Sequence, residues 1–254
     1  MNDIYEYLKY TANLISHSAF GNKLILKGGS VLISKLIECQ RTDLYRLTSD
    51  LDIHCDKKEV WIAFYNNIEN ILNNNNMGYI YKIVKRRSEE KGLIQSDSLV
   101  FNLIDGNKTI KFKIDMNIKS NNIITVEYSP ILNMSTYDAY TMLSDKIASI
   151  SSRTIFRRIK DLYDLAVLIT LQDYSYSSVM KHIKVKHPNF TPINMLVQSN
   201  FRDLEHAYNA FEGIVNKPDI RYLVVYCSTF LEPIYNGNQG ELLWDARLTR
   251  WMVQ

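Results

Sequence analysis

Two aspartates in a short apolar segment are the residues of this sequence best suited to chemistry. Asp50 and Asp52 alternate with Leu51 and Ile53, so on a strand both carboxylates leave the same face. Adjacent carboxylates repel each other unless a cation lies between them, and Mg²⁺ is a common cation with oxygen ligands. The competing interpretation is an ordinary acidic strand end in solvent, which needs no cation.

A third acid, Asp115, lies on the polar side of segment 109–118, which alternates cleanly between apolar and polar residues. If the sheet places Asp115 beside Asp50 and Asp52, three carboxylates converge. Such a site suits Mg²⁺, as one or two ions, with Mn²⁺ as an alternative, and it can clamp an attacking and a leaving oxygen. Taken alone, Asp115 is only a polar outer-face residue.

The run Lys27-Gly28-Gly29-Ser30 follows the short apolar segment 24–26 and precedes a predicted helix. Glycine permits a tight turn and a close approach of the backbone, and we expect Ser30 to cap the helix. The N–H groups at the start of a helix bind phosphate readily. A plain tight turn is the competing interpretation.

Segment 155–171 is predicted to be a helix with a charged side and an apolar side. The charged side carries Arg157, Lys160, Asp161 and Asp164. Because this side becomes apolar one turn later, we expect the cluster to lie at the edge of a cleft that faces a nucleotide. Exposed ion pairs, worth a few tenths of a kcal/mol, are the competing interpretation.

The pattern of apolar residues predicts an α+β protein with two domains. Residues 1–132 are expected to form a mixed sheet with flanking helices, and residues 133–254 a helical domain. The turn Asp105-Gly106-Asn107 is expected to close a hairpin. The predicted strands are 24–26, 51–55, 79–86, 99–104, 109–118 and 123–128. The predicted helices are 3–19, 30–39, 57–72, 136–152, 155–171, 176–185, 203–215 and 219–235, followed by a short helical tail after Gly240.

The bulk composition excludes several classes of protein. The chain has 254 residues and a net charge of +3, which is too mild to indicate a nucleic-acid ligand by itself. Its three cysteines, Cys39, Cys55 and Cys227, form no CxxC pair, so we expect neither a disulfide framework nor a zinc site. No segment resembles a signal peptide or a membrane span, and a cytoplasmic protein with no membrane partner is expected.

These motifs together resemble the polymerase-β-like nucleotidyltransferase superfamily, whose pattern is GGS, then RxTxDLDh, then a third Asp on a later strand. The second piece is here Arg46-Leu47-Thr48-Ser49-Asp50-Leu51-Asp52-Ile53. The pair Asp145-Lys146 and the run Lys160-Asp161-Leu162-Tyr163-Asp164-Leu165 resemble its AbiEii/MenT-type toxin branch. The resemblance covers about residues 24–170. The interval between Ser30 and Asp50 is longer than usual, which predicts an inserted loop around Glu38–Tyr45.

The resemblance implies a fold, an activity and residue roles. It implies in-line attack of an acceptor on the α-phosphate of a nucleoside triphosphate, with pyrophosphate leaving and the helical domain completing the active-site cleft. Asp50, Asp52 and Asp115 would bind the metal, and Asp115 would also orient or deprotonate the attacking hydroxyl. Lys146 and Asp164 would be catalytic as well. The nucleotide would contact Lys27, Gly28, Gly29, Ser30, Arg46, Thr48, Ser49, Lys146, Lys160 and Asp161.

The acceptor is less well defined than the nucleotide site. Basic residues and 17 tyrosines suit a single-stranded RNA end, with charge for the backbone and rings for the bases. The resemblance implies the 3′ end of tRNA, a block of translation, a role in toxin–antitoxin or phage-defence systems, and a cognate antitoxin. A protein hydroxyl or small molecule as acceptor, a non-catalytic nucleotide- or RNA-binding scaffold, and plain solvated faces remain alternatives. The basic clusters are Lys82, Lys85, Arg86, Arg87 and Lys91, and Arg153, Arg157, Arg158 and Lys160.

Overall fold

The computed structural model describes residues 3–91, 94–118, 125–151, 155–192, 196, 201–237 and 240–253. They form two compact units. The N-terminal unit comprises Met1–Glu38, Leu47–Asn122 and Val126–Tyr137, and the C-terminal unit comprises Cys39–Arg46, Ile123–Thr125 and Asp138–Gln254. A single cut at residue 132 would give two continuous halves, whereas these units exchange short segments of chain.

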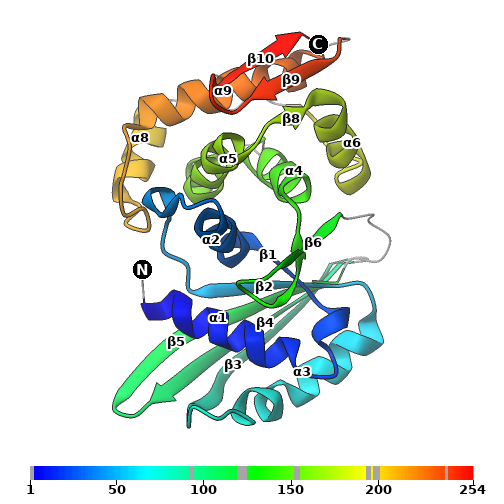
Figure 1. The fold of residues 1–254 in the computed structure, drawn as a ribbon, viewed down its shortest axis with the longest axis vertical. Coiled ribbons are helices and arrows are strands. Elements are labelled where there is room, and N and C mark those ends of the chain that lie inside the picture. Colours follow the sequence, from blue (N-terminus) through cyan, green and yellow to red (C-terminus); the bar gives the residue numbers. More distant parts are fainter. Residues whose placement is uncertain are drawn as a thin grey trace. The chain divides into compact units, whose positions relative to one another are not determined.

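The N-terminal unit is built on a seven-stranded sheet with the order β3-β4-β5-β2-β1-β7-β6 (Figure 1). The pairs β2–β5 and β1–β7 are parallel and the other pairs are antiparallel, so the sheet is mixed. This confirms the predicted fold class. The strands are β1 (Ile25–Lys27), β2 (Asp50–Cys55), β3 (Ile80–Lys91), β4 (Ile94–Asp105), β5 (Lys108–Ile118), β6 (Val126–Ser129) and β7 (Met134–Tyr137).

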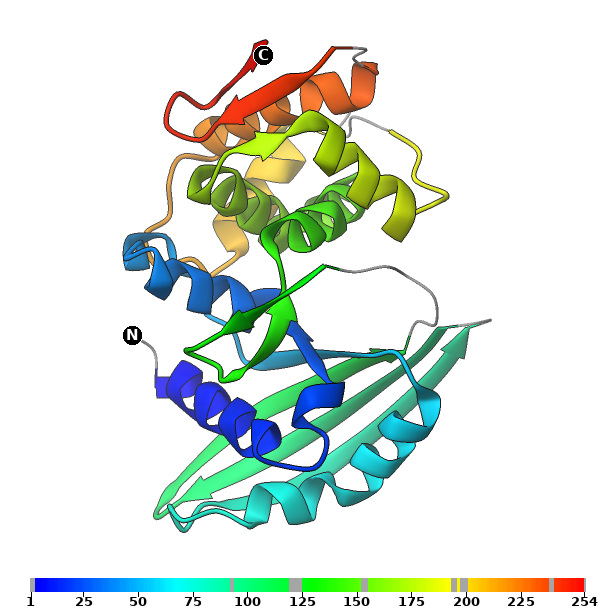
Figure 2. The same ribbon diagram turned by 45° about the vertical axis from the view of Figure 1, so that its right-hand side comes forward.

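Helices α1 (Asp3–Ser16) and α3 (Lys58–Asn73) cover one face of this sheet (Figure 2). Trp61 of α3 donates a hydrogen bond to Asp97 of β4, and the hydroxyls of Thr11 and Tyr81 join α1 to β3. The covered face carries the fully buried side chains Leu51, Ile53, Ile114 and Met116. Because side chains alternate along a strand, the polar residues of β2 and β5 lie on the opposite face.

The hairpin between β4 and β5 confirms the turn read from Asp105-Gly106-Asn107. Asp105 pairs with Lys108, and Gly106 takes a φ of 56° in the left-handed region that glycine favours. Strand β3 is an edge strand, and its pairing with β4 shifts register between Ile83 and Lys85, which marks a bulge or irregularity. The predicted strands 79–86 and 99–104 were too short because their outer parts are polar.

In the C-terminal unit, helices pack around α5 (Ile159–Leu171), which is buried at every position from Asp161 to Ile169. None of the described helices is long and apolar enough to cross a membrane. The other α-helices within the described part of this unit are α4 (Ala139–Ile150), α6 (Tyr176–Lys186), α8 (Phe201–Ala210) and α9 (Ile220–Asn236). A three-stranded sheet completes the unit, in the order β10 (Arg250–Val253), β9 (Leu242–Asp245) and β8 (Tyr174–Ser175).

Several predicted elements differ from the structure at particular places, and the helix expected at 203–215 ends at Ala210. The expected helical tail after Gly240 is the hairpin β9–β10, because the rings of Trp244 and Trp251 pack on Phe230 at 4.9 and 5.1 Å between ring centroids. The helix expected at 136–152 begins only at Ala139, since Asp138 caps it by accepting from Thr141 N, and β7 precedes it. The helix expected at 155–171 begins at Ile159, after a short 3₁₀ turn at Ile155–Arg157.

The C-terminal aromatic cluster gives a test of this architecture. Trp244 is fully buried and its Nε1 donates to the Ile169 carbonyl at 2.7 Å. We expect Trp244→Ala to lower the free energy of unfolding by about 3–5 kcal/mol, because it leaves a cavity and an unpaired carbonyl. Denaturant unfolding measures this loss. Val253→Ala, at a residue that is 85% exposed, is the matched control and should change little; equal stability of the two variants would contradict the packing described here.

Candidate active site

The parallel pairing of β2 with β5 brings the predicted acids together. Asp52 lies opposite Asp115, and Asp50 lies opposite Lys113. Paired residues on adjacent strands point to the same face and are about 4.8 Å apart across the ladder. Asp50, Asp52 and Asp115 therefore lie on one face of the sheet, and all three are partly exposed.

Gly28 lies directly against this acidic face. Lys27, the last residue of β1, pairs with Asp52, and the chain then turns into α2 (Gly28–Glu38) through a φ of 75° at Gly28. A Cβ atom at position 28 would lie 2.0 Å from Asp52 Oδ2. The turn therefore requires glycine twice, for its backbone conformation and for the closeness of the carboxylate.

Ser30 does not cap the helix as expected, because α2 begins two residues earlier, at Gly28. Its side chain is fully buried, and its hydroxyl has no hydrogen-bond partner among the described residues. An unpaired buried hydroxyl costs free energy, so a polar ligand that reached it would be favoured. The preceding Gly29 is also buried.

The segment before β2 contacts both acidic strands. The Ser49 hydroxyl donates to Asp50 Oδ1 at 3.3 Å, and the Ser49 carbonyl accepts from Lys113 N at 3.0 Å. Ser49 is exposed and Thr48 is partly exposed. Ser49 thus joins β2 to β5 at the position where the carboxylates meet.

Lys113 is a residue of this face that the sequence interpretation did not assign to the site. Its ammonium forms an ion pair with Asp115, two residues away on the same side of β5. Burial opposes the charged form of Lys113, but the hydrogen bond and charge of Asp115 and the charges of Asp50 and Asp52 raise its pKa above the ordinary value. The sequence did offer one signal for this assignment: Lys113 precedes Asp115 by two residues, so both side chains leave the same side of the strand.

The carboxylates match a divalent cation by their chemistry. Carboxylate oxygens are the usual protein ligands of Mg²⁺, and the strand register puts three of these carboxylates on one face. Among the residues that the structure describes, no three Asp, Glu, His or Cys side chains already surround a metal position. The cation that these carboxylates meet is instead the Lys113 ammonium.

The C-terminal unit contains a second charged group, which is buried. The guanidinium of Arg46 grips Asp164 with two hydrogen bonds, Nε to Oδ1 at 2.5 Å and a terminal nitrogen to Oδ2 at 2.8 Å. The side chain of Arg46 is 5% exposed and that of Asp164 is fully buried. Arg46 therefore has its planar donor edge directed at a carboxylate.

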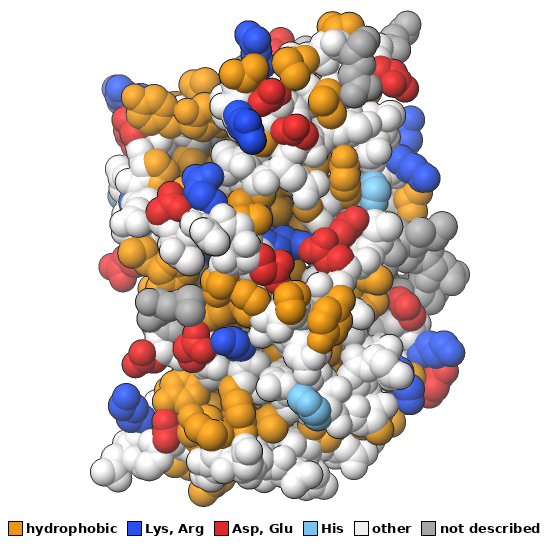
Figure 3. All heavy atoms as spheres, in the orientation of Figure 1, with side chains coloured by type: hydrophobic (Ala, Val, Ile, Leu, Met, Phe, Trp, Pro, Cys, Tyr) orange, Lys and Arg blue, Asp and Glu red, His pale blue; other side chains and the backbone are white. Residues whose placement is uncertain are grey.

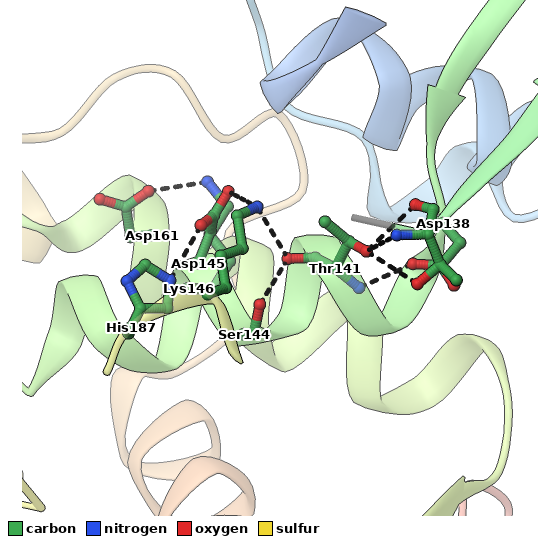
Figure 4. A network of polar contacts seen from close by, with 9 residues as sticks. Asp138, Thr141, Ser144, Asp145, Lys146, Asp161 and His187 are labelled. Atoms are coloured by element: carbon green, nitrogen blue, oxygen red, sulfur yellow. Dashed lines mark hydrogen bonds and ion pairs between the residues drawn. The ribbon is translucent and has the colours of Figure 1, made fainter. Parts of the chain in front are cut away.

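Lys146 of α4 completes this group. Its Nζ lies 2.7 Å from Asp161 Oδ1 and 2.7 Å from Asp164 Oδ2, and Figure 4 shows Lys146 directed at Asp161. Two cations and two anions thus balance each other in the interior, as a buried charged network requires. We call Arg46, Lys146, Asp161 and Asp164 the buried charge network.

The ionisation of this network follows from its geometry. Burial by itself would raise the pKa of Asp164, but the charges and hydrogen bonds of Arg46 and Lys146 hold it well below the ordinary value. Burial likewise opposes the charged form of Lys146, yet Asp164 and Asp161 raise its pKa above the ordinary value. Lys146 and Asp164 are therefore both charged at neutral pH.

The charged side predicted for helix 155–171 is organised differently from the expectation. Asp161 and Asp164 are buried, so they do not lie on a solvated helix edge, although Asp161 Oδ2 also lies 3.7 Å from the half-exposed guanidinium of Arg158. Lys160 is exposed and forms no ion pair with the network among the described residues, and Arg157 precedes the helix. The amphipathic pattern misled because an aspartate with two cationic partners can be buried.

The loop at residues 39–46 packs within the C-terminal unit. The Tyr163 hydroxyl donates to the Leu44 carbonyl at 2.9 Å, and Asn216 Nδ2 donates to the Asp43 carbonyl at 3.0 Å. The sequence interpretation treated this loop only as an insertion. Its contacts show that it carries Arg46 to Asp164.

The residue before Lys146 has partners of its own. Asp145 accepts from Lys186 Nζ at 2.7 Å and lies 3.0 Å from His187 Nε2 (Figure 4). Lys186 is buried. The end of α6 is thereby fixed to α4 beside Lys146, an arrangement for which the sequence offered no local signal.

The glycine turn can be tested by adding one methyl group. We expect Gly28→Ala to lower the free energy of unfolding by more than the roughly 1–2 kcal/mol of left-handed backbone strain, since its Cβ also meets Asp52. Gly106→Ala is the matched control, because Gly106 also has a positive φ but open space around it. Thermal and denaturant unfolding measure both variants, and an equal loss would exclude the contact with Asp52.

The buried charge network predicts a pH dependence. Asp164→Asn removes the carboxylate partner of Arg46 and leaves Lys146 with Asp161 alone, so one buried positive charge is unbalanced and we expect a loss of about 3–5 kcal/mol at pH 7. A lowered carboxyl pKa stabilises the fold above the unfolded value of about 3.9 and ceases to do so as the pH falls. The difference between wild type and variant should therefore narrow below about pH 4.

Unfolding curves between pH 3 and pH 7 test this dependence. Glu232→Gln removes a carboxylate from the exposed side of α9 and is the matched control, with little change expected at either pH. A pH-independent difference between wild type and Asp164→Asn would show that the carboxylate is not ionised in the fold.

Comparison with known proteins agrees with this architecture. The structure resembles JHP933 from Helicobacter pylori, with a TM-score of 0.57 and 12% identity over 93% of this chain and 94% of that one. It also resembles a second H. pylori protein, described as a candidate nucleotidyltransferase, with a TM-score of 0.54 and 12% identity over 91% and 93% of the two chains. No curated protein sequence matches significantly.

At such low identity these likenesses show the fold alone. A family model, in contrast, matches residues 11–210, which contain the acidic face, the glycine turn and the buried charge network. That model is the nucleotidyl transferase AbiEii toxin of type IV toxin–antitoxin systems. The chain therefore belongs to the AbiEii nucleotidyltransferase toxin family, and it is a nucleotidyltransferase.

Proposed function

We propose that this nucleotidyltransferase uses Mg²⁺, or Mn²⁺ in its place, to transfer a nucleotide from a nucleoside triphosphate to the 3′ end of tRNA. The observation that carries the proposal is the register of β2 and β5, which puts Asp52 opposite Asp115 with Asp50 beside them. When bound, the metal would neutralise the phosphates and stabilise the charge of in-line attack.

The residues of the N-terminal unit have defined parts in this proposal. Asp50, Asp52 and Asp115 supply carboxylate oxygens to the cation, and Asp115 also orients the attacking hydroxyl. Gly28 keeps the backbone close to Asp52. The buried hydroxyl of Ser30 has no hydrogen-bond partner among the described residues, and a phosphate oxygen could accept from it. Further nucleotide contacts are proposed for Lys27, Gly29, Thr48 and Ser49.

The C-terminal unit contributes positive charge whose position is fixed. Two donors of the Lys146 ammonium go to Asp161 and Asp164, and an ammonium has three. We assign the remaining donor to the triphosphate. Arg46, Asp161 and Asp164 then act as positioning residues that hold Lys146, rather than as groups that touch the reacting atoms. Lys160, which is exposed, is assigned a more peripheral phosphate contact.

The RNA acceptor is supported by exposed cations next to aromatic rings. Lys82, Lys85, Arg86 and Arg87 are exposed on edge strand β3, and the Arg86 guanidinium lies 4.9 Å from the ring centroid of Tyr65. Arg157 and Arg158 are exposed before α5, beside Phe156. The side chain of Lys91 and all of Arg153 lie outside the described residues.

Charge on the face shown in Figure 3 is mixed. Lysine and arginine side chains are scattered among aspartates and glutamates over this face, without one continuous basic field. Contacts to an RNA backbone release counterions, so binding that weakens as salt rises would support an RNA acceptor. Family membership supports the remaining proposals, which are a block of translation, a cognate antitoxin, a role in phage defence and a cytoplasmic location.

A labelling assay tests the function. The purified protein is incubated with total tRNA, Mg²⁺ and each α-labelled nucleoside triphosphate in turn. We expect labelled tRNA with wild type and a loss of at least about 100-fold with Asp52→Asn, because removal of one charge-stabilising group costs that much. Glu59→Gln, an exposed carboxylate of the same unit, is the matched control and should keep wild-type transfer.

Each outcome of this assay has a distinct meaning. Label on a protein or a small molecule instead of tRNA would keep the chemistry and replace the acceptor. Full transfer by Asp52→Asn would show that the reaction does not require the acidic face. Treatment with EDTA should abolish transfer, and transfer that persists in EDTA would contradict the metal requirement.

A further inference from the structure

Lys113 occupies a particular place on the acidic face. Along β5 it shares its side with Asp115, and across the ladder it pairs with Asp50, while Asp115 pairs with Asp52. These four side chains form a block of two by two positions on adjacent strands. Lys27 flanks the block, because it pairs with Asp52 on the other side.

The contacts of Lys113 are those of a counter-ion. Its ammonium is ion-paired with Asp115, and the side chains are 39% and 26% exposed. Three carboxylates bear on its charge, and without it the block would carry three negative charges and no cation. Half-exposed pairs contribute little to folding, so a change of Lys113 should leave the protein folded.

The same position conflicts with a bound metal. An ammonium and a divalent cation that seek the same carboxylate oxygens repel each other, and at about 4 Å this repulsion is substantial even near a protein surface. A nucleoside triphosphate changes the balance, because its phosphates are ligands for the metal and acceptors for an ammonium. The triphosphate would then give both Lys27 and Lys113 an anionic partner.

We propose that Lys113 is a built-in counter-ion of the carboxylate site, which weakens the binding of a divalent cation alone and makes the metal bind together with the nucleotide. This inference rests on the proposed function, since it takes the acidic face as the metal site. Lys113 touches a metal ligand but is not itself a catalytic residue in this account. Lys113 affects whether the cation can bind before the nucleotide is present.

Mn²⁺ binding measured by electron paramagnetic resonance, with the ion alone and no nucleotide, tests the proposal directly. We expect Lys113→Met to tighten Mn²⁺ binding by about tenfold, because it removes the competing charge. Lys113→Arg keeps that charge and should bind as weakly as wild type. Thermal unfolding in EDTA checks that every variant is folded.

Lys111→Met is the matched control. Lys111 lies on the same side of β5, is exposed, and precedes Lys113 by two residues, which is about 7 Å along a strand. It removes the same charge from the protein as a whole, so a change of less than about twofold is expected there. If Lys111→Met and Lys113→Met change Mn²⁺ binding equally, the effect comes from the net charge of the protein and the proposal is overturned.

The remaining outcomes separate this inference from the function on which it rests. If Lys113→Met binds Mn²⁺ no more tightly than wild type while Asp52→Asn loses binding, the acidic face is still the metal site. The proposed counter-ion role of Lys113 would then be wrong. Binding that Asp52→Asn does not weaken would place the cation elsewhere, and both proposals would fail. A wild type that binds Mn²⁺ as tightly alone as with a non-hydrolysable triphosphate would also overturn the counter-ion.

Discussion

The C-terminal unit depends on one buried carboxylate. Asp164 is fully buried, and a charge in that position is tolerated only because Arg46 and Lys146 both donate to it. Those donors come from a loop and from a second helix, so the carboxylate joins three stretches of chain. Asp161 supplies the anion that brings the four charges to zero. An apolar replacement of the whole group could be as stable, so stability alone does not require these charges.

Under the proposed function, these charges fix the position of the Lys146 ammonium. A lysine on a flexible stem ordinarily samples many rotamers, and ordering it costs free energy. Here two carboxylates fix its end before any ligand arrives, while Arg46 fixes one of those carboxylates. The side chain of Lys146 thus loses its conformational entropy during folding and not on ligand binding. A phosphate would meet a cation that is already in place, which is how electrostatic preorganisation works.

The sequence predicted the elements of the acidic face but not their register. The alternation of 109–118 is local, so the side of β5 that carries Asp115 could be read directly. That Asp52 pairs with Asp115, and that Lys113 joins them, depends on pairing between distant strands. The partner of Arg46 is 118 residues away, which no local pattern specifies. The hairpin β9–β10 was missed because its strands are four residues long and are held by ring packing.

Edge strand β3 has a consequence for how this protein behaves in concentrated solution. The side chains of Asn73 and Glu69 bond the backbone of β3 at Tyr81 and Ile83, and Ile80 and Val84 expose apolar side chains on this strand. Such an edge invites pairing with the edge of another molecule, and lysines and bulges are the usual protection. Lys82, Lys85 and the register shift beside Ile83 supply both. Charge-neutralising changes made on this strand to study RNA would therefore also remove a barrier to aggregation, so their effects are interpretable only on protein shown to be monodisperse.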